Sequence, residues 1–187
     1  MEDFADTLGA AQLGDEGAFT TLFREFNPAV VRYLAVLAGR DLAEDLAAET
    51  WVAALRGFAA FAGDEKSLRA WLLTIARARW VDSVRAHTRR PELVTDAPPE
   101  LPSAEDVHEQ VERGFTTDWA LRLIATLPPE QAEVITLRVV GQLEVADVAE
   151  LTDKTANHVR VLTHRGLKRL AQALGDPAAM ADQEERL

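Results

Sequence analysis

Residues 149–170 read AELTDKTANHVRVLTHRGLKRL, and this stretch decides the fold of the C-terminal half because two helical patterns meet in it across a very short break. From residue 154 to residue 170 it holds five Lys or Arg and no Asp or Glu, although the whole chain has a formal net charge of −11. A short helix, a tight turn and a longer basic helix are the elements of a helix-turn-helix, in that order. The stretch therefore predicts a helix-turn-helix whose second helix carries the positive charge.

The rest of the C-terminal half is also helical in pattern. We predict four helices, over about residues 117–126, 130–140, 144–151 and 154–173. Pro129 suits a first helical turn, where its missing backbone N–H is not needed, and Gly141 separates two of the helices. The expected apolar side of the last helix consists of Ala156, Val159, Leu162, Leu167 and Leu170.

The polar side of this last helix suits contact with DNA. Arg and Asn make paired hydrogen bonds to guanine and adenine edges in the major groove, and Lys or Thr can hold phosphates. The side chains on this side are Lys154, Thr155, Asn157, His158, Arg160, Val161, His164, Arg165 and Lys168. We predict that they face a DNA duplex.

The N-terminal half shows three amphipathic helical patterns, over residues 16–38, about 41–58 and about 68–85. Pro28 lies inside the first helix and could bend or split it. Asp41 and Glu44 have the spacing of a capping box at the start of the second helix. The expected apolar side of that second helix consists of Leu42, Leu46, Val52 and Leu55.

A second positive segment lies in this half. Residues 67–90 have a net charge of +5, whereas residues 91–153 have a net charge of −11. Salt limits a surface field to about 8 Å, so a positive segment can bind an anion in spite of the total charge. Arg69, Arg77 and Trp80 share one side of the predicted helix, and cations beside an aromatic ring suit single-stranded nucleic acid. The pattern leaves open whether Trp80 is such a platform or a core residue.

The two halves are separated by residues 91–116, which hold four prolines and many acids. We expect an all-α protein, in which two small helical domains (1–90 and 117–174) are joined by this acidic flexible linker and followed by a short acidic tail, 175–187. The second would be a four-helix domain containing the helix-turn-helix. The chain has no Cys, no signal-peptide pattern and no apolar run near 18 residues, so we expect a cytoplasmic protein without membrane insertion.

Enzymatic and metal-binding functions have weak support. The sequence has neither a Gly-rich phosphate loop nor a recognisable nucleophile motif. Glu105 and His108 have the spacing of half a di-iron site, but such a site needs two of these pairs. Asp41, Asp45 and Glu49 recur along one helical face, which is far more often a solvated or protein-docking face than a metal site. We expect no enzymatic activity, no metal and no cofactor.

Three stretches resemble one family. They are AEDLAAETWVAALRGF (43–58), WLLTIARARWVDSVR (71–85) and residues 127–170, from LPPEQ to the end of the opening stretch. Together, and in this order, they are similar to the extracytoplasmic-function (ECF, group 4) sigma factors of the sigma-70 family, the small specificity subunits of bacterial RNA polymerase. The resemblance implies a non-catalytic protein that grips core polymerase and reads the −10 and −35 promoter elements.

The resemblance also implies roles for individual residues. Contact with core polymerase, at its clamp helices, would fall to Asp45, Leu46, Glu49 and Trp51. The opened −10 strand would meet Lys66, Arg69, Arg77, Arg79 and Trp80. The −35 duplex would meet Arg160, Val161, His164 and Arg165 in its groove, and Lys154 and Thr155 near its phosphates. Further implied partners are the polymerase flap, promoter DNA and an anti-sigma factor.

The chain departs from the family pattern in places. Ala48 and Ala78 replace the usual Gln and Asn, and Asp153 stands where the turn often has Gly. Asp tolerates the left-handed backbone that such a turn needs. We expect no appended regulatory domain after the second domain. The main alternative is a helix-turn-helix regulator that works without polymerase, and a helical adaptor is a third class.

Overall fold

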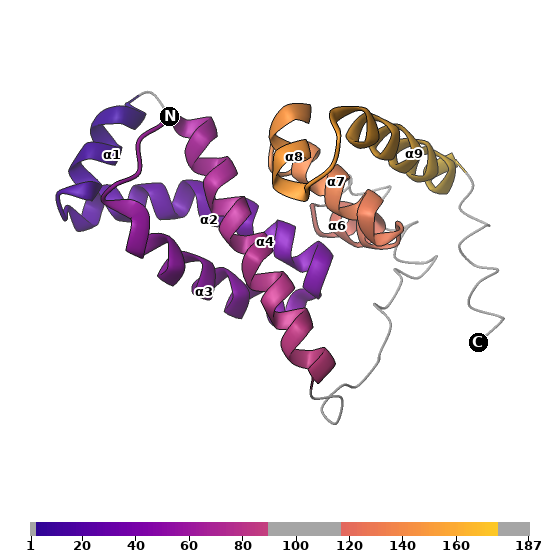
Figure 1. Ribbon diagram of the computed structural model, residues 1–187, viewed down its shortest axis with the longest axis horizontal. Helices are drawn as coiled ribbons and strands as arrows, with labels where there is room; N and C mark the ends of the chain where they lie inside the picture. The colour runs from indigo at the N-terminus through magenta and orange to yellow at the C-terminus, as the bar shows by residue number, and fades with distance from the viewer. Residues whose placement is uncertain (1–2, 90–116, 176–187) are drawn as a thin grey trace. The chain divides into compact units, whose positions relative to one another are not determined.

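The structure is a computed structural model that describes residues 3–89 and 117–175, and every regular element within them is an α-helix. The helices are α1 (Phe4–Gln12), α2 (Glu16–Ala38), α3 (Arg40–Phe58), α4 (Glu65–Arg89), α6 (Thr117–Ala125), α7 (Pro129–Val139), α8 (Val145–Thr152) and α9 (Ala156–Gly175). They form two compact units, α1–α4 and α6–α9 (Figure 1). The predicted all-α class is confirmed. The predicted linker, which includes Glu105 and His108, and the tail beyond residue 175 lie outside the described residues.

Helix α2 forms the centre of the first unit. Its predicted limits are confirmed, and it runs through Pro28 without a break. The carboxylate of Asp15 caps its start by accepting a hydrogen bond of 2.7 Å from the backbone N–H of Ala18. Leu22, Phe26, Val30 and Leu34 are buried at four-residue intervals. Because this buried stripe continues on both sides of the exposed Pro28, packing holds the helix together across the proline.

Helix α3 begins differently from the prediction. Gly39, with φ +81°, precedes the first helical residue, and no side chain caps the start of the helix. Asp41 therefore lies within the first turn, and the predicted capping box is wrong.

The apolar side predicted for α3 is also wrong except at Leu46. Leu42, Val52 and Leu55 are 39%, 58% and 53% exposed. The buried residues are mostly small ones: Ala43, Leu46, Ala47, Thr50, Trp51, Ala54 and Phe58. Small side chains let α3 lie close to α2 and α4, and this close packing turns the three large aliphatic side chains outward.

Trp51 joins α3 to α2. Its indole N–H donates a hydrogen bond of 3.0 Å to the side-chain oxygen of Asn27. Its ring lies 5.0 Å from the ring of Phe23 and 5.9 Å from the ring of Phe19, measured between centroids. Only 5% of the residue is exposed. Trp51 is therefore a core residue of the first unit.

The second unit contains the predicted helix-turn-helix. Its four helices lie within two residues of their predicted limits. Asp153 ends α8 in the left-handed conformation (φ 55°, ψ 44°), as predicted, and the N–H of Lys154 donates to the carbonyl of Ala149 across the turn. Val159 and Leu162 of α9 are buried, but Leu167 is 49% exposed and its prediction as an apolar-side residue is wrong.

Gly166 allows α9 to lie directly against α7. A Cβ atom at this position would come within 2.9 Å of Cγ1 and 3.2 Å of Cδ1 of Ile135, which is 1% exposed. Real side chains do not pack this closely, so the two helices would have to move apart or Ile135 would have to leave its rotamer.

We predict that Gly166→Ala destabilises the second unit. Overpacking of a core costs about 1–3 kcal/mol, and the better helix propensity of Ala returns at most about 1 kcal/mol. Urea unfolding should show a net loss of up to about 2 kcal/mol on this balance. A Cβ added at Gly175 of the same helix would meet no atom within 4 Å, so Gly175→Ala is the control and should cost nothing. A gain in stability from Gly166→Ala would contradict this packing.

Candidate nucleic-acid and protein interfaces

The outer side of α9 gathers most of the predicted DNA-contacting residues. At 3.6 residues per turn, the exposed arc lies opposite the buried Val159, Leu162 and Gly166. The exposed residues of this arc are Asn157, His158, Arg160, Val161, His164, Arg165 and Lys168. The arc contains no acidic residue, because α9 has none. We call these seven residues the α9 face.

Thr155 lies at the start of this helix and caps it. Its hydroxyl oxygen accepts a hydrogen bond of 3.2 Å from the backbone N–H of His158, and its carbonyl accepts one of 3.0 Å from the N–H of Val159. The residue is exposed, and a hydroxyl that accepts one hydrogen bond can still donate another. Thr155 therefore both shapes the start of α9 and borders the α9 face.

Lys154 differs from the other predicted DNA contacts because its ammonium already has a partner. Its Nζ lies 2.6 Å from Oε1 of Glu130, and its side chain is only 15% exposed. The hydrogen bond and the charge of Lys154 lower the pKa of the Glu130 carboxyl, and His158 adds a smaller effect in the same direction. The structure therefore does not present Lys154 as an unpaired cation ready for a phosphate.

The positive segment on α4 does not form a single face. Arg69 pairs with Glu65 at 3.2 Å and lies over the ring of Phe26, 5.4 Å from its centroid, so it covers the core of the first unit. Arg79 lies 3.6 Å from Asp82. Arg79 is two residues from Arg77, which places the two on different sides of the helix.

The other predicted −10 residues on this segment lie as follows. Lys66 is exposed in the first turn of α4, and Arg77 and Trp80 are half-buried. Trp80 is neither fully buried, as a core residue would be, nor fully exposed, as an open platform would be.

The loop before α4 is held by contacts that sequence reasoning missed. The side chain of Gln12 donates hydrogen bonds of 2.9 Å and 2.7 Å to the carbonyls of Phe58 and Phe61. Asp64 accepts hydrogen bonds from the backbone N–H and the hydroxyl of Ser67, and these bonds lower the pKa of its carboxyl. The spacing of Asp64 and Ser67 at a helix start was a readable signal. The Gln12 contacts span 46 and 49 residues and leave no signal in the sequence.

The outer side of α3 brings acidic and apolar side chains together. Asp45 and Glu49, which were predicted to contact polymerase, are exposed there. Leu42, Val52 and Leu55 extend the same side, as helical spacing requires. We call these five residues the α3 face. Leu46 and Trp51, which were also predicted to contact polymerase, are each 5% exposed and lie in the core of the first unit.

The described part of the chain offers neither a membrane span nor a metal-binding cluster. None of the helices within residues 3–89 and 117–175 is both long and apolar enough to cross a membrane. In the same ranges, no group of three or more His, Asp or Glu side chains is placed to hold a metal ion.

Comparison with known protein families assigns each of the two helical units to a family region. Residues 22–90 match Sigma-70 region 2, and residues 117–170 match Sigma-70, region 4. A helical protein that carries both regions is of the sigma-70 class.

Relatives narrow the class. Over 173 residues the chain is 32% identical to the ECF RNA polymerase sigma factor BldN of Streptomyces coelicolor, covering 90% of this chain and 64% of BldN. Over 183 residues it is 30% identical to the ECF RNA polymerase sigma factor ShbA of Streptomyces griseus, covering 90% of this chain and 96% of ShbA. The chain therefore belongs to the ECF RNA polymerase sigma factors.

A solved structure shares the fold. It is the sigma factor RpoE in complex with the anti-sigma factor NepR from Bartonella quintana, with a TM-score of 0.66 and 21% identity over 84% of this chain and 96% of RpoE. The family's function is promoter-directed initiation of transcription with RNA polymerase, and the two sigma-70 regions of this chain support that function.

Proposed function

We propose that this chain binds core RNA polymerase and directs it to promoters, with residues 1–90 reading the −10 element, residues 117–174 reading the −35 element and residues 91–116 linking them. The observation that carries the proposal is the α9 face: an exposed cationic helix surface on a chain with a net charge of −11. We propose that the chain itself is not catalytic and acts in the cytoplasm, where its polymerase works.

The α9 face fits the major groove of duplex DNA. That groove accepts one α-helix, and Arg makes bidentate hydrogen bonds to guanine there. Arg160 and His164 lie one turn apart, as do Val161 and Arg165, so each pair can follow the groove floor. Asn157 and His158 lie at the N-terminal end of α9, which helix-turn-helix proteins direct at the bases.

We propose that the α4 segment handles the opened −10 strand with fewer residues than the sequence suggested. Lys66 and Arg77 supply positive charge, and the half-buried Trp80 offers an aromatic ring for stacking. Arg69 does not contact the strand in this proposal, because its guanidinium lies over the ring of Phe26 and is paired with Glu65.

The α3 face is the proposed contact with core polymerase at its clamp helices. Three exposed aliphatic side chains beside two carboxylates match a partner surface that is apolar with a basic rim. Leu46 and Trp51 are buried. We therefore propose that Leu42, Val52 and Leu55 supply the apolar part of the contact with core polymerase.

We predict that Val52→Ala combined with Leu55→Ala weakens binding to core polymerase. Truncating central apolar side chains of an interface costs about 1–2 kcal/mol each, so the dissociation constant should rise at least tenfold. Leu13→Ala is the matched control, since Leu13 is 92% exposed in the same unit and lies off the α3 face. Binding can be followed by fluorescence anisotropy of the labelled chain, with circular dichroism to confirm folding. Equal binding by all three proteins would contradict the assignment.

We also propose regulation by an anti-sigma factor. The support is family membership together with the solved structure of RpoE, which is a complex with the anti-sigma factor NepR. Such a partner would cover the α3 face, the α9 face or both.

The alternative of a polymerase-independent regulator makes a distinct prediction. It requires tight binding of duplex DNA by the chain alone, whereas a net charge of −11 opposes such binding. Titrating a promoter duplex with the chain alone and with the chain bound to core polymerase separates the two functions. The sigma-factor proposal expects sequence-specific binding only in the second titration.

A further inference from the structure

One ion pair stands at the edge of the α9 face. Glu130 lies in the first turn of α7, and Lys154 lies in the turn between α8 and α9, 24 residues later. Their side chains meet at 2.6 Å. The lysine side chain is 15% exposed and the glutamate side chain is 59% exposed, so the carboxylate forms the outward part of the pair.

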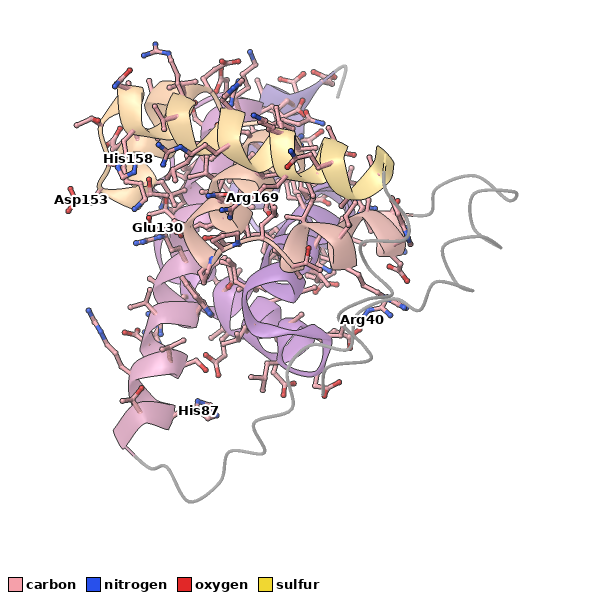
Figure 2. The ribbon with its side chains drawn as sticks, turned by 90° about the vertical axis from the view of Figure 1, so that its right-hand side faces the viewer. Arg40, His87, Glu130, Asp153, His158 and Arg169 are labelled. Atoms are coloured by element: carbon pink, nitrogen blue, oxygen red, sulfur yellow. The ribbon has the colours of Figure 1, made fainter. Side chains whose placement is uncertain are left out.

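The carboxylate also lies close to the DNA-reading helix. His158, a member of the α9 face, lies in the first turn of α9, four residues after the Lys154 that meets Glu130. Its charge is a smaller cause of the lowered pKa of Glu130. Figure 2 shows Glu130 and His158 at the same end of this unit. Since its pKa is lowered, Glu130 carries a full negative charge at neutral pH.

This placement works against DNA in two ways. A lysine that neutralises a phosphate releases a counterion from DNA, and this release favours binding. Lys154 must first break its ion pair with Glu130, so it contributes less to binding than an unpaired lysine would. The outward carboxylate itself repels phosphate oxygens within a distance that salt does not fully screen.

We propose that Glu130 is an electrostatic brake on DNA binding: it holds the ammonium of Lys154 away from the phosphate backbone and presents a negative charge beside the α9 face. The inference rests on the proposed function, in which this face meets a duplex. Because phosphates carry no sequence information, the brake lowers affinity equally for promoter and non-promoter DNA. It thereby makes binding more dependent on polymerase without altering base preference.

The test compares four full-length proteins: wild type, Glu130→Gln, Lys154→Met and the double variant. Gln keeps the shape and one hydrogen-bond acceptor but removes the charge. Each protein is bound to core polymerase, and its affinity for a promoter duplex and a random duplex is measured over a series of salt concentrations. Glu25→Gln is the control, because it changes the net charge equally from an exposed position on α2 in the other unit.

Glu130→Gln should bind both duplexes roughly three- to tenfold more tightly, with a salt slope steeper by about 1, as expected for one added phosphate contact. Lys154→Met should bind no more tightly than wild type. The double variant should keep the part of the gain that comes from removing the Glu130 charge but should lose the steeper salt slope, because it has no ammonium to contact a phosphate. Glu25→Gln should bind like wild type.

Two outcomes would overturn the brake. Unchanged affinity and slope in Glu130→Gln would show that the pair does not affect DNA, and weaker binding with a lower melting temperature would show that the pair only supports the fold. Failure of the proposed function would look different. Adding Arg160→Ala to wild type or to Glu130→Gln would then leave the affinity for the promoter duplex unchanged, because the α9 face would not contact DNA.

Discussion

Replacing both Arg160 and Arg165 by Ala should abolish promoter-directed transcription while the protein stays folded and bound to polymerase. Both side chains are exposed on the α9 face, so their removal leaves the core unchanged. A bidentate contact between Arg and a base is worth about 1–3 kcal/mol of discrimination, so two contacts amount to roughly a 30-fold to 20,000-fold loss. The measurement is the yield of transcripts from a promoter that depends on this chain.

Arg169→Ala is the charge control for this experiment. It removes a cation from the same helix, but Arg169 is directed to α7, where its guanidinium donates a hydrogen bond of 3.3 Å to Gln131. It should retain most transcription. A loss from Arg169→Ala as large as the loss from Arg160→Ala or Arg165→Ala alone would show that only total charge matters, which contradicts base reading by the α9 face.

Replacing Trp51 by Ala should destabilise the first unit by about 3–5 kcal/mol, the usual cost of truncating a buried aromatic residue. The ring contacts with Phe19 and Phe23 and the hydrogen bond to Asn27 are lost together. Whole domains are stable by only about 5–15 kcal/mol, so this unit would be close to unfolding. Urea unfolding followed by circular dichroism measures the change.

Trp51→Phe separates a core role from a surface role. It keeps most of the packing and loses the hydrogen bond to Asn27, so it should cost about 1–2 kcal/mol. A surface contact of polymerase would behave differently. Trp51→Ala would then weaken polymerase binding with no change in the unfolding curve, and that result would contradict the core assignment.

The second unit could be predicted closely from the sequence because its signals are local. The polar and apolar residues of α9 alternate with the helical period, and the turn at Asp153 needs only a residue that tolerates positive φ. Leu167 was the exception. Its spacing fits the apolar side, but Gly166 beside it makes the contact with α7 and leaves Leu167 outside.

Helix α3 shows where local pattern fails. Ala, Leu and Val occur on every side of this helix, so the position of the buried stripe depends on which side the neighbouring helices contact closely. The sequence prediction took the large aliphatic residues as the buried side of α3 and so placed Val52 and Leu55 in the core. In the structure, alanines occupy much of the buried side instead.

Side-chain contacts between segments far apart in the sequence also could not be predicted, because they too depend on how the helices pack. The contacts of Gln12 with Phe58 and of Lys154 with Glu130 join segments 46 and 24 residues apart. No periodicity relates such residues. They become visible only when helix packing brings them together.

Transcription in a defined system tests the central claim most directly. Core polymerase is incubated with a library of promoter templates, with and without this chain, and the start sites are mapped. The account predicts new start sites only when the chain is present, sharing two upstream sequence elements, of which the distal one disappears in the Arg160→Ala, Arg165→Ala variant. A library on which the chain creates no start site would contradict the account.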